Sequence, residues 1–316
     1  MLSRIGILVL ATLVVASNAF AEPVSFGSAR VGSTTHSISI AIVKAMSAHS
    51  DLDVRVVPMK TPTLALLKVA SGDMMVGTAG AVELDLARTG QGFFDGKIMD
   101  DLVAVGNIFP FRMMFAGRAT SDANDISQLV GKSIPREFRA TSTGEMLMKA
   151  LLNGGGLTFE SVKSVPVIGF SDSRDAFKQD RTEVMPFIVG TPQIVKMQQV
   201  VGDMKAIGFP NGPTVEARVK AVHPAFRVVD VDADPEALGQ PGAMRALAYD
   251  YVLYTRKDAP DALVEALATT LIDNHEEMAK SVKAFRNLEI DRVALDVGIP
   301  FHPAAVKVYR EKGLLK

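Results

Sequence analysis

A loop rich in glycine and small hydroxyl residues joins the first predicted strand to the first predicted helix. Its sequence is Gly32-Ser33-Thr34-Thr35-His36. The first backbone N–H groups of a helix have no partner inside the helix, and the helix dipole places partial positive charge there, so such a loop can hold an anion. Hydroxyl side chains here also cap helices. We expect Ser33, Thr34 and Thr35 to contact a ligand as well as cap, whereas His36 either contacts the ligand or only caps.

A second loop of the same kind follows a predicted strand near the middle of the chain. It runs Arg136-Glu137-Phe138-Arg139-Ala140-Thr141-Ser142-Thr143-Gly144. Thr141, Ser142 and Thr143 offer hydroxyls at a helix start, and a guanidinium group can bind a carboxylate through two parallel hydrogen bonds. We favour Arg139 over Arg136 as the ligand contact because Arg139 lies closer to the helix start. The alternative is a solvated surface loop.

Three further threonines follow other predicted strands. Thr61, Thr78 and Thr191 stand at strand ends, where open α/β sheets bind their ligands. Thr191 also precedes Pro192, and proline is favoured at the first position of a helix. Lys60 either places its ammonium group near the same edge or is simply solvated. We include the three threonines among the candidate ligand contacts.

The remaining composition gives little support for catalysis or for other partner classes. The chain has no cysteine, its five histidines show no metal-ligand spacing, and neither a G-x-S-x-G elbow nor a phosphate-binding glycine loop occurs. The formal net charge of −1 argues against nucleic acid as a partner. We therefore expect a protein that is no enzyme and that holds neither a metal nor a cofactor.

The N-terminus has the order of a secretory signal. One positive charge at Arg4 precedes an apolar stretch of about a dozen residues, and the triplet Ala19-Phe20-Ala21 follows. That stretch is short for a membrane span. We expect residues 1–21 to be a signal peptide that is cleaved after Ala21; the alternative is an uncleaved N-terminal anchor.

Short β-rich runs alternate with helical patterns along the remaining chain. Strands are predicted at 24–31, 54–58, 74–78, 102–108, 113–117, 132–135, 165–168, 184–189 and 245–255. Such alternation favours mainly parallel sheets in an α/β fold with two lobes and a ligand cleft between them. We expect lobe 1 at 22–110, lobe 2 at 111–208, and a return to lobe 1 with C-terminal helices at 209–316.

Several segments resemble the TAXI-type solute receptors of tripartite ATP-independent periplasmic (TRAP) transporters. The most specific match is Ile299-Pro300-Phe301-His302-Pro303-Ala304-Ala305-Val306-Lys307-Val308-Tyr309-Arg310-Glu311-Lys312-Gly313. Weaker matches are Ala41-Ile42-Val43-Lys44, Ser71-Gly72-Asp73, Gly131-Lys132-Ser133 and Thr141-Ser142-Thr143-Gly144. The family's usual pocket residues are replaced in this sequence. Thr35 and His36 stand where the family has tyrosines, and Gly80 and Val82 replace its glutamine and aspartate.

The resemblance implies a monomeric periplasmic receptor with a two-lobed periplasmic binding protein fold of type II-like form. Such a receptor delivers its ligand to an integral-membrane TRAP permease. From the two helix N-termini and Arg139 we expect the ligand to be a small organic anion whose charged group is a carboxylate. An alternative is a receptor for an ATP-driven importer or a sensor kinase. We expect residues 300–313 to support the fold rather than to bind ligand, with the ring of Phe301 buried.

Overall fold

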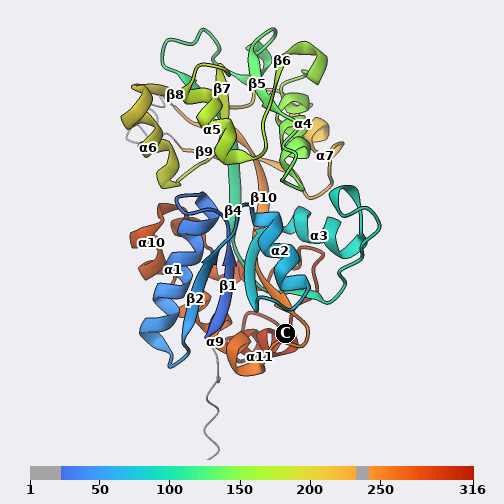
Figure 1. Cartoon of the computed structure of the whole chain (residues 1–316), viewed down its shortest axis with the longest axis vertical. Coiled ribbons are helices and arrows are strands. Elements are labelled where there is room, and N and C mark those ends of the chain that lie inside the picture. Colours follow the sequence, from blue (N-terminus) through green and yellow to red (C-terminus); the bar gives the residue numbers. More distant parts are fainter. Residues whose placement is uncertain (1–22, 233–241) are drawn as a thin grey trace, which may run out of the picture.

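The structure, a computed structural model, describes residues 23–232 and 242–316 and confirms an α/β fold with two lobes (Figure 1). The expected signal peptide at 1–21 lies outside the described residues. Lobe 1 contains both the first and the last elements of the chain. Its elements are β1 (Val24–Ser28), α1 (Thr34–His49), β2 (Val54–Pro58), α2 (Pro62–Ala70), β3 (Val76–Gly80), α3 (Ala81–Thr89), α9 (Asp261–Asp273), α10 (His275–Ser281) and α11 (Pro303–Glu311).

Lobe 2 is built from the middle of the chain. Its elements are β5 (Ser133–Arg136), α4 (Gly144–Gly154), β6 (Lys163–Pro166), α5 (Phe170–Lys178), β7 (Val184–Ile188), α6 (Pro192–Val201), β8 (Met204–Ile207), α7 (Val215–Lys220) and β9 (Arg227–Val231). Because α7 and β9 belong to this lobe, the chain does not return to lobe 1 at residue 209 as expected. The return occurs later, within the next strand.

Two long strands connect the lobes. β4 (Leu102–Arg118) leads from lobe 1 into lobe 2, and β10 (Met244–Arg256) leads back beside it in the antiparallel direction (Figure 1). The sequence predicted two short strands at 102–108 and 113–117, but β4 continues through Pro110, and the expected boundary at 110/111 falls within it. Pro110 interrupts the apolar pattern without ending the strand, which explains the error.

The main sheet has eight strands, and its pairing is mixed rather than mainly parallel. The order is β2-β1-β3-β10-β4-β7, with β8 paired to β4 and β9 paired to β10. β1 is parallel to β2 and β3, as strand–helix alternation predicts, whereas both crossing strands are antiparallel to all their neighbours. β5 and β6 form a separate parallel pair. The antiparallel pairs arise because each crossing strand must connect the lobes directly.

Helix signals in the sequence explain where several helices begin and what they bury. Ser33 caps α1 by accepting a hydrogen bond from the backbone N–H of His36 at 3.1 Å. On α9, Leu263, Leu267 and Leu271 recur at helical spacing, and all three are fully buried in the core of lobe 1. The capped N-terminus of α1 therefore lies at the carboxyl end of β1, and α9 turns its apolar face toward the core of lobe 1.

The C-terminal segment closes the side of lobe 1 remote from lobe 2 (Figure 1). The backbone of Ala104 in β4 pairs with residues 300 and 302 through two hydrogen bonds of 2.8 Å. Phe301 contacts the ring of Tyr309 edge-on and buries its own ring only in part. Tyr309 is the fully buried aromatic residue of this segment. None of the helices in the described ranges has the length and apolarity that a membrane crossing requires.

Candidate functional site

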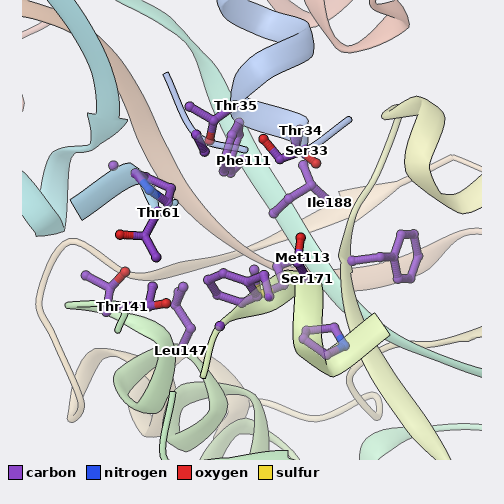
Figure 2. Close-up of a pocket in the computed structure, with 18 of the residues that line it drawn as sticks. Ser33, Thr34, Thr35, Thr61, Phe111, Met113, Thr141, Leu147, Ser171 and Ile188 are labelled. Carbon is purple, nitrogen blue, oxygen red and sulfur yellow. The ribbon is translucent and has the colours of Figure 1, made fainter. Parts of the chain in front are cut away.

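A cavity of about 530 Å³ lies between the lobes, beside the crossing strands. Helix N-termini surround it: those of α1 and α2 from lobe 1, and those of α4, α5 and α6 from lobe 2. Figure 2 shows the hydroxyl groups of Thr61 and Thr141 on one side of the cavity and those of Ser33 and Ser171 on the other. The cavity volume falls within the range of about 300–1,000 Å³ that is typical of small-molecule sites.

Seven of the predicted ligand contacts line this cavity. They are Ser33, Thr34, Thr35, Thr61, Thr141, Thr143 and Thr191. Some of their hydroxyl groups also have partners in the protein. Thr61 accepts a hydrogen bond from the backbone N–H of Leu64 at 3.2 Å, and Thr191 donates to the carbonyl of Ile188 at 2.8 Å. The two loops chosen from the sequence therefore do meet from opposite lobes.

Three other predicted contacts lie outside the cavity lining. His36 points back toward Ser28, with 3.5 Å between its Nδ1 and the serine Oγ, and burial lowers the pKa of its imidazole. Thr78 lies beneath Tyr251, whose hydroxyl group is 3.2 Å from the threonine Oγ1. Ser142 is occupied by contacts between the lobes. These residues support the cavity wall from behind, so they are not placed as direct contacts.

Neither arginine of the second loop reaches the cavity. Arg139 is exposed and pairs with Glu137, while Arg136 pairs with Glu145 at 2.7 Å and lies over the ring of Phe159. The backbone explains this outcome, because Glu137 and Phe138 adopt positive φ values of 71° and 33°. That turn directs the ring of Phe138, 1% exposed, into the core and leaves Arg139 outside. The choice of Arg139 is therefore wrong in placement.

Three other cationic residues line the cavity: Arg30, Lys60 and Arg174. Arg174 is partly buried in the middle of α5 and donates a hydrogen bond to the hydroxyl group of Ser171, in the first turn of that helix, at 2.8 Å. Burial lowers its pKa; Asp175 opposes that effect, and the positive charge of Arg30 adds to it. No ion pair of Arg30 or Arg174 occurs within 4.0 Å among the residues that the structure describes. Two arginines from opposite lobes thus line the same cavity, and the negative charges nearest to Arg174, those of Asp175 and Asp172, form no direct ion pair with it.

A cluster of hydrogen bonds joins the lobes at one edge of the cavity. Glu83 of α3 is 5% exposed and accepts hydrogen bonds from Thr63 of α2, at 2.7 Å, and from Ser142 of lobe 2. The backbone N–H of Ser142 also donates to the hydroxyl group of Thr63 at 3.1 Å. Burial raises the pKa of Glu83, although the two hydroxyl donors oppose the shift. We call Thr63, Glu83 and Ser142 the inter-lobe cluster.

A second contact between the lobes lies near the start of α1. The side-chain amide of Gln193, at the start of α6, donates to the carbonyl of Gly32 at 3.0 Å. Its amide oxygen is buried and has no hydrogen-bond partner in the described part of the chain. Together with the inter-lobe cluster, this contact holds the cavity closed on two sides, which identifies the described conformation as a closed one.

Aromatic rings form the wall where the crossing strands pass the cavity. Tyr249 lies opposite Phe111 in the antiparallel register of β10 and β4. Phe111 stacks on Tyr251 with 3.9 Å between ring centroids and an angle of 12°, and it meets Tyr249 nearly at right angles at 5.6 Å. The ring of Phe226 also packs against that of Tyr249, with 6.0 Å between the ring centroids. All four residues line the cavity, so a ligand meets an aromatic surface on this side.

The sequence matches one protein family over residues 26–313. The chain belongs to the NMT1-like family. The match includes every residue of the cavity lining named above, so the family assignment concerns the whole two-lobed unit rather than one lobe.

Three solved structures of similar fold are distant in sequence from this NMT1-like protein. MatC from Rhodopseudomonas palustris, with bound malate, has a TM-score of 0.58 at 12% identity, over 93% of this chain and 99% of MatC. PhnD1 from Prochlorococcus marinus, in complex with methylphosphonate, has a TM-score of 0.55 at 10% identity, over 92% of this chain and 98% of PhnD1. The ligand-binding component of an ABC-type import system from Staphylococcus aureus, with zinc bound, has a TM-score of 0.53 at 9% identity, over 93% of each of the two chains. At these identities the likeness establishes the fold.

Sequence reasoning missed the cationic and aromatic parts of this NMT1-like cavity. Arg30 was placed inside a predicted strand at 24–31, but β1 ends at Ser28, so Arg30 stands at the strand end. Arg174 falls within a segment predicted only as a helix, and its place in the middle of α5 gives no signal that its side chain reaches the cavity. For Tyr249 and Phe111, the sequence contains no signal that selects the cavity face of each crossing strand. Within the described ranges, no cluster of three His, Asp or Glu side chains is arranged to hold a metal.

Proposed function

We propose that this protein is a periplasmic solute-binding receptor that closes its two lobes around a small organic anion. The observation that carries the proposal is the pair Arg30 and Arg174, which line the cavity from opposite lobes and form no ion pair within 4.0 Å among the described residues. Lys60 adds a third positive charge, whereas the acidic lining residues are Asp172 and Glu83. Because burial raises the pKa of Glu83, its negative charge is disfavoured there.

The two arginines also provide a reason for closure to depend on ligand. Closing the lobes brings two positive charges together in a partly desolvated space, where their repulsion is stronger than in water. An anion between them converts this repulsion into attraction and adds charge-assisted hydrogen bonds. The open form is therefore favoured without ligand and the closed form with it. We place the bending in the middle of β4 and β10, since these strands connect the lobes.

Two of the structural neighbours support the choice of an anion, because MatC was solved with malate and PhnD1 with methylphosphonate. In this protein the anionic group would lie between Arg30 and Arg174, near the hydroxyl groups of Ser33 and Ser171. We propose a carboxylate, since a guanidinium group can bind its two oxygens through parallel hydrogen bonds. The described residues offer a binding cavity and no pair of groups set up as acid and base, so we propose binding without turnover.

The membrane partner that we propose is a permease that imports the bound ligand. The Staphylococcus aureus neighbour is part of an ABC-type import system and supports an ATP-driven partner. The C-terminal motif of residues 299–313 supports the TRAP alternative, which couples import to an ion gradient. Uptake of a labelled ligand distinguishes them: depletion of ATP with the gradient maintained stops only the first, and collapse of the gradient with ATP maintained stops only the second.

Mass spectrometry of compounds retained by the natively purified protein tests the proposed function. We expect a small organic anion, released on denaturation in an amount close to one molecule per chain, which rebinds to the refolded protein and stays chemically unchanged. A neutral or cationic ligand would contradict the anion assignment. Conversion of the ligand during incubation would contradict binding without turnover.

A further inference from the structure

We propose that the ligand is an aryl carboxylate whose ring carries a hydrogen-bonding substituent, a proposal that rests on the proposed function and names its substrate class. The carboxylate would lie between Arg30 and Arg174. The ring would lie against the aromatic wall of Phe111 and Tyr249, and the substituent would meet the hydroxyl group of Tyr249. Three observations support this division of the cavity.

The first observation is the geometry of the aromatic wall. Tyr249 and Phe111 form a directly opposed cross-strand pair, and their rings meet at 74°. Aromatic rings attract each other both edge to face and in offset stacks, so a wall that presents rings in two orientations suits another ring. The wall is also fixed in place, since Phe111 is stacked on the ring of Tyr251. The hydroxyl group of Tyr251 is hydrogen-bonded to the hydroxyl groups of Thr35 and Thr78, with oxygen–oxygen distances of 3.1 and 3.2 Å. A ligand ring therefore finds a preorganised surface.

The second observation is the hydroxyl group of Tyr249. The residue is 7% exposed and lines the cavity, yet its hydroxyl group has no hydrogen-bond partner among the described residues. It is not enclosed like the hydroxyl group of Tyr254, which is sealed in the core without a partner. Gly80 leaves room for the ring, because a Cβ there would lie 3.1 Å from the Cε2 atom of Tyr249. A buried polar group that faces a cavity and lacks a partner is a binding group for a ligand.

The third observation is the apolar lining between the hydroxyl groups. Figure 2 shows Met113, Leu147 and Ile188 around the cavity together with Phe111. A compact dicarboxylate could place its second charge near Lys60, but it would leave these apolar surfaces in contact with water. Burial of apolar ligand surface is favourable at roughly 25 cal/mol per Å². The cavity therefore favours an anion with one charged end and an apolar body.

Isothermal titration calorimetry with four classes of probe tests the proposal. The probes are the three hydroxybenzoate isomers, benzoate, cyclohexanecarboxylate and succinate. We expect at least one hydroxybenzoate to bind about three- to ten-fold more tightly than benzoate, the effect of one added hydrogen bond. We expect benzoate to bind roughly two- to ten-fold more tightly than cyclohexanecarboxylate because of the aromatic contacts. Succinate should bind most weakly.

Two variants locate these preferences. Tyr249→Phe removes only a hydroxyl group that has no partner in the described protein, so the fold is retained. It should abolish the preference for the hydroxybenzoate over benzoate. Arg139→Ala, whose side chain is exposed and lies outside the cavity, is the control that should keep the wild-type preference. Phe111→Leu should reduce the preference for benzoate over cyclohexanecarboxylate. Thermal unfolding of both variants shows whether they fold, and competition for a retained ligand provides a second measurement of affinity.

The outcomes separate this proposal from the proposed function. Tightest binding of succinate overturns the aryl carboxylate assignment while the anion receptor stands. An unchanged hydroxybenzoate preference in Tyr249→Phe overturns the role of that hydroxyl group. If none of the probes binds, the aryl assignment fails, and the identity of the natively retained ligand then decides the anion receptor independently.

Discussion

Two buried tyrosines, one in the C-terminal segment and one in the cavity wall, occupy similar surroundings but serve different ends. Each packs against a glycine of a neighbouring strand: Tyr309 against Gly106, and Tyr249 against Gly80. The hydroxyl group of Tyr309 donates to the carbonyl of Val105, whereas that of Tyr249 has no partner in the described chain. The hydroxyl group of Tyr309 is thus satisfied within the protein, where it stabilises lobe 1, whereas that of Tyr249 remains available in the cavity, where a ligand can satisfy it.

The largest expected effect tests the stabilising half of this comparison. Tyr309→Ala removes a fully buried ring and its hydrogen bond, so we expect the free energy of unfolding to fall by about 3–5 kcal/mol. Chemical denaturation monitored by circular dichroism measures the change. The folded fraction should bind ligand with unchanged affinity, because Tyr309 lies far from the cavity. Normal stability with lost binding would reverse the roles assigned to the two regions.

The binding half depends most on Arg174. Arg174→Ala should weaken ligand binding about ten- to a hundred-fold, since a hydrogen bond to a charged group contributes roughly 1.5–3 kcal/mol. Arg174→Lys should recover part of the affinity, because lysine retains the charge but not the two-pronged geometry. Calorimetric titration measures both variants. Arg139→Ala is the matched control, since Arg139 is exposed and pairs with Glu137. Equal losses in Arg139→Ala and Arg174→Ala would contradict the placement of the anion.

A smaller effect is expected at Phe301. Its ring is only partly buried and contacts Tyr309 edge-on with 5.7 Å between centroids. Phe301→Ala should therefore lower the free energy of unfolding by about 1–2 kcal/mol, less than half the cost at Tyr309. Parallel denaturation curves of the two variants give the difference directly. A larger loss in the free energy of unfolding for Phe301→Ala than for Tyr309→Ala would show that Phe301, not Tyr309, stabilises the C-terminal segment.

The smallest effect concerns pH and the inter-lobe cluster. Burial between the lobes raises the pKa of Glu83 above 4.5, and opening would bring that carboxyl group back toward water. The closed form thus favours the protonated group, and closing takes up a proton. The stabilisation of the closed form is complete below pH 4.5 and is lost as pH rises through the raised pKa. We expect ligand affinity to fall over this range of pH, and Glu83→Gln to flatten the profile. An identical slope in Glu83→Gln would exclude this role.

Much of the scaffold was predictable because its signals are local. Helical spacing and capping residues located α1 and α9, and strand ends located the hydroxyl groups of the cavity. The continuity of β4 through Pro110 was not predictable, since it depends on pairing with β10 across more than a hundred residues. Arg139 was misplaced because the positive φ values at 137 and 138 decide which side chain turns inward. The aromatic wall also depends on long-range register, which a single sequence does not reveal.

Small-angle X-ray scattering with and without the natively retained ligand tests the central claim most directly. A receptor that closes two lobes around an anion should show a smaller radius of gyration when ligand is saturating. Arg174→Ala should require about ten- to a hundred-fold more ligand for the same change, in proportion to its weakened affinity. The described closed conformation should reproduce the profile of the ligand-bound protein. An unchanged profile at saturating ligand would contradict closure around the ligand.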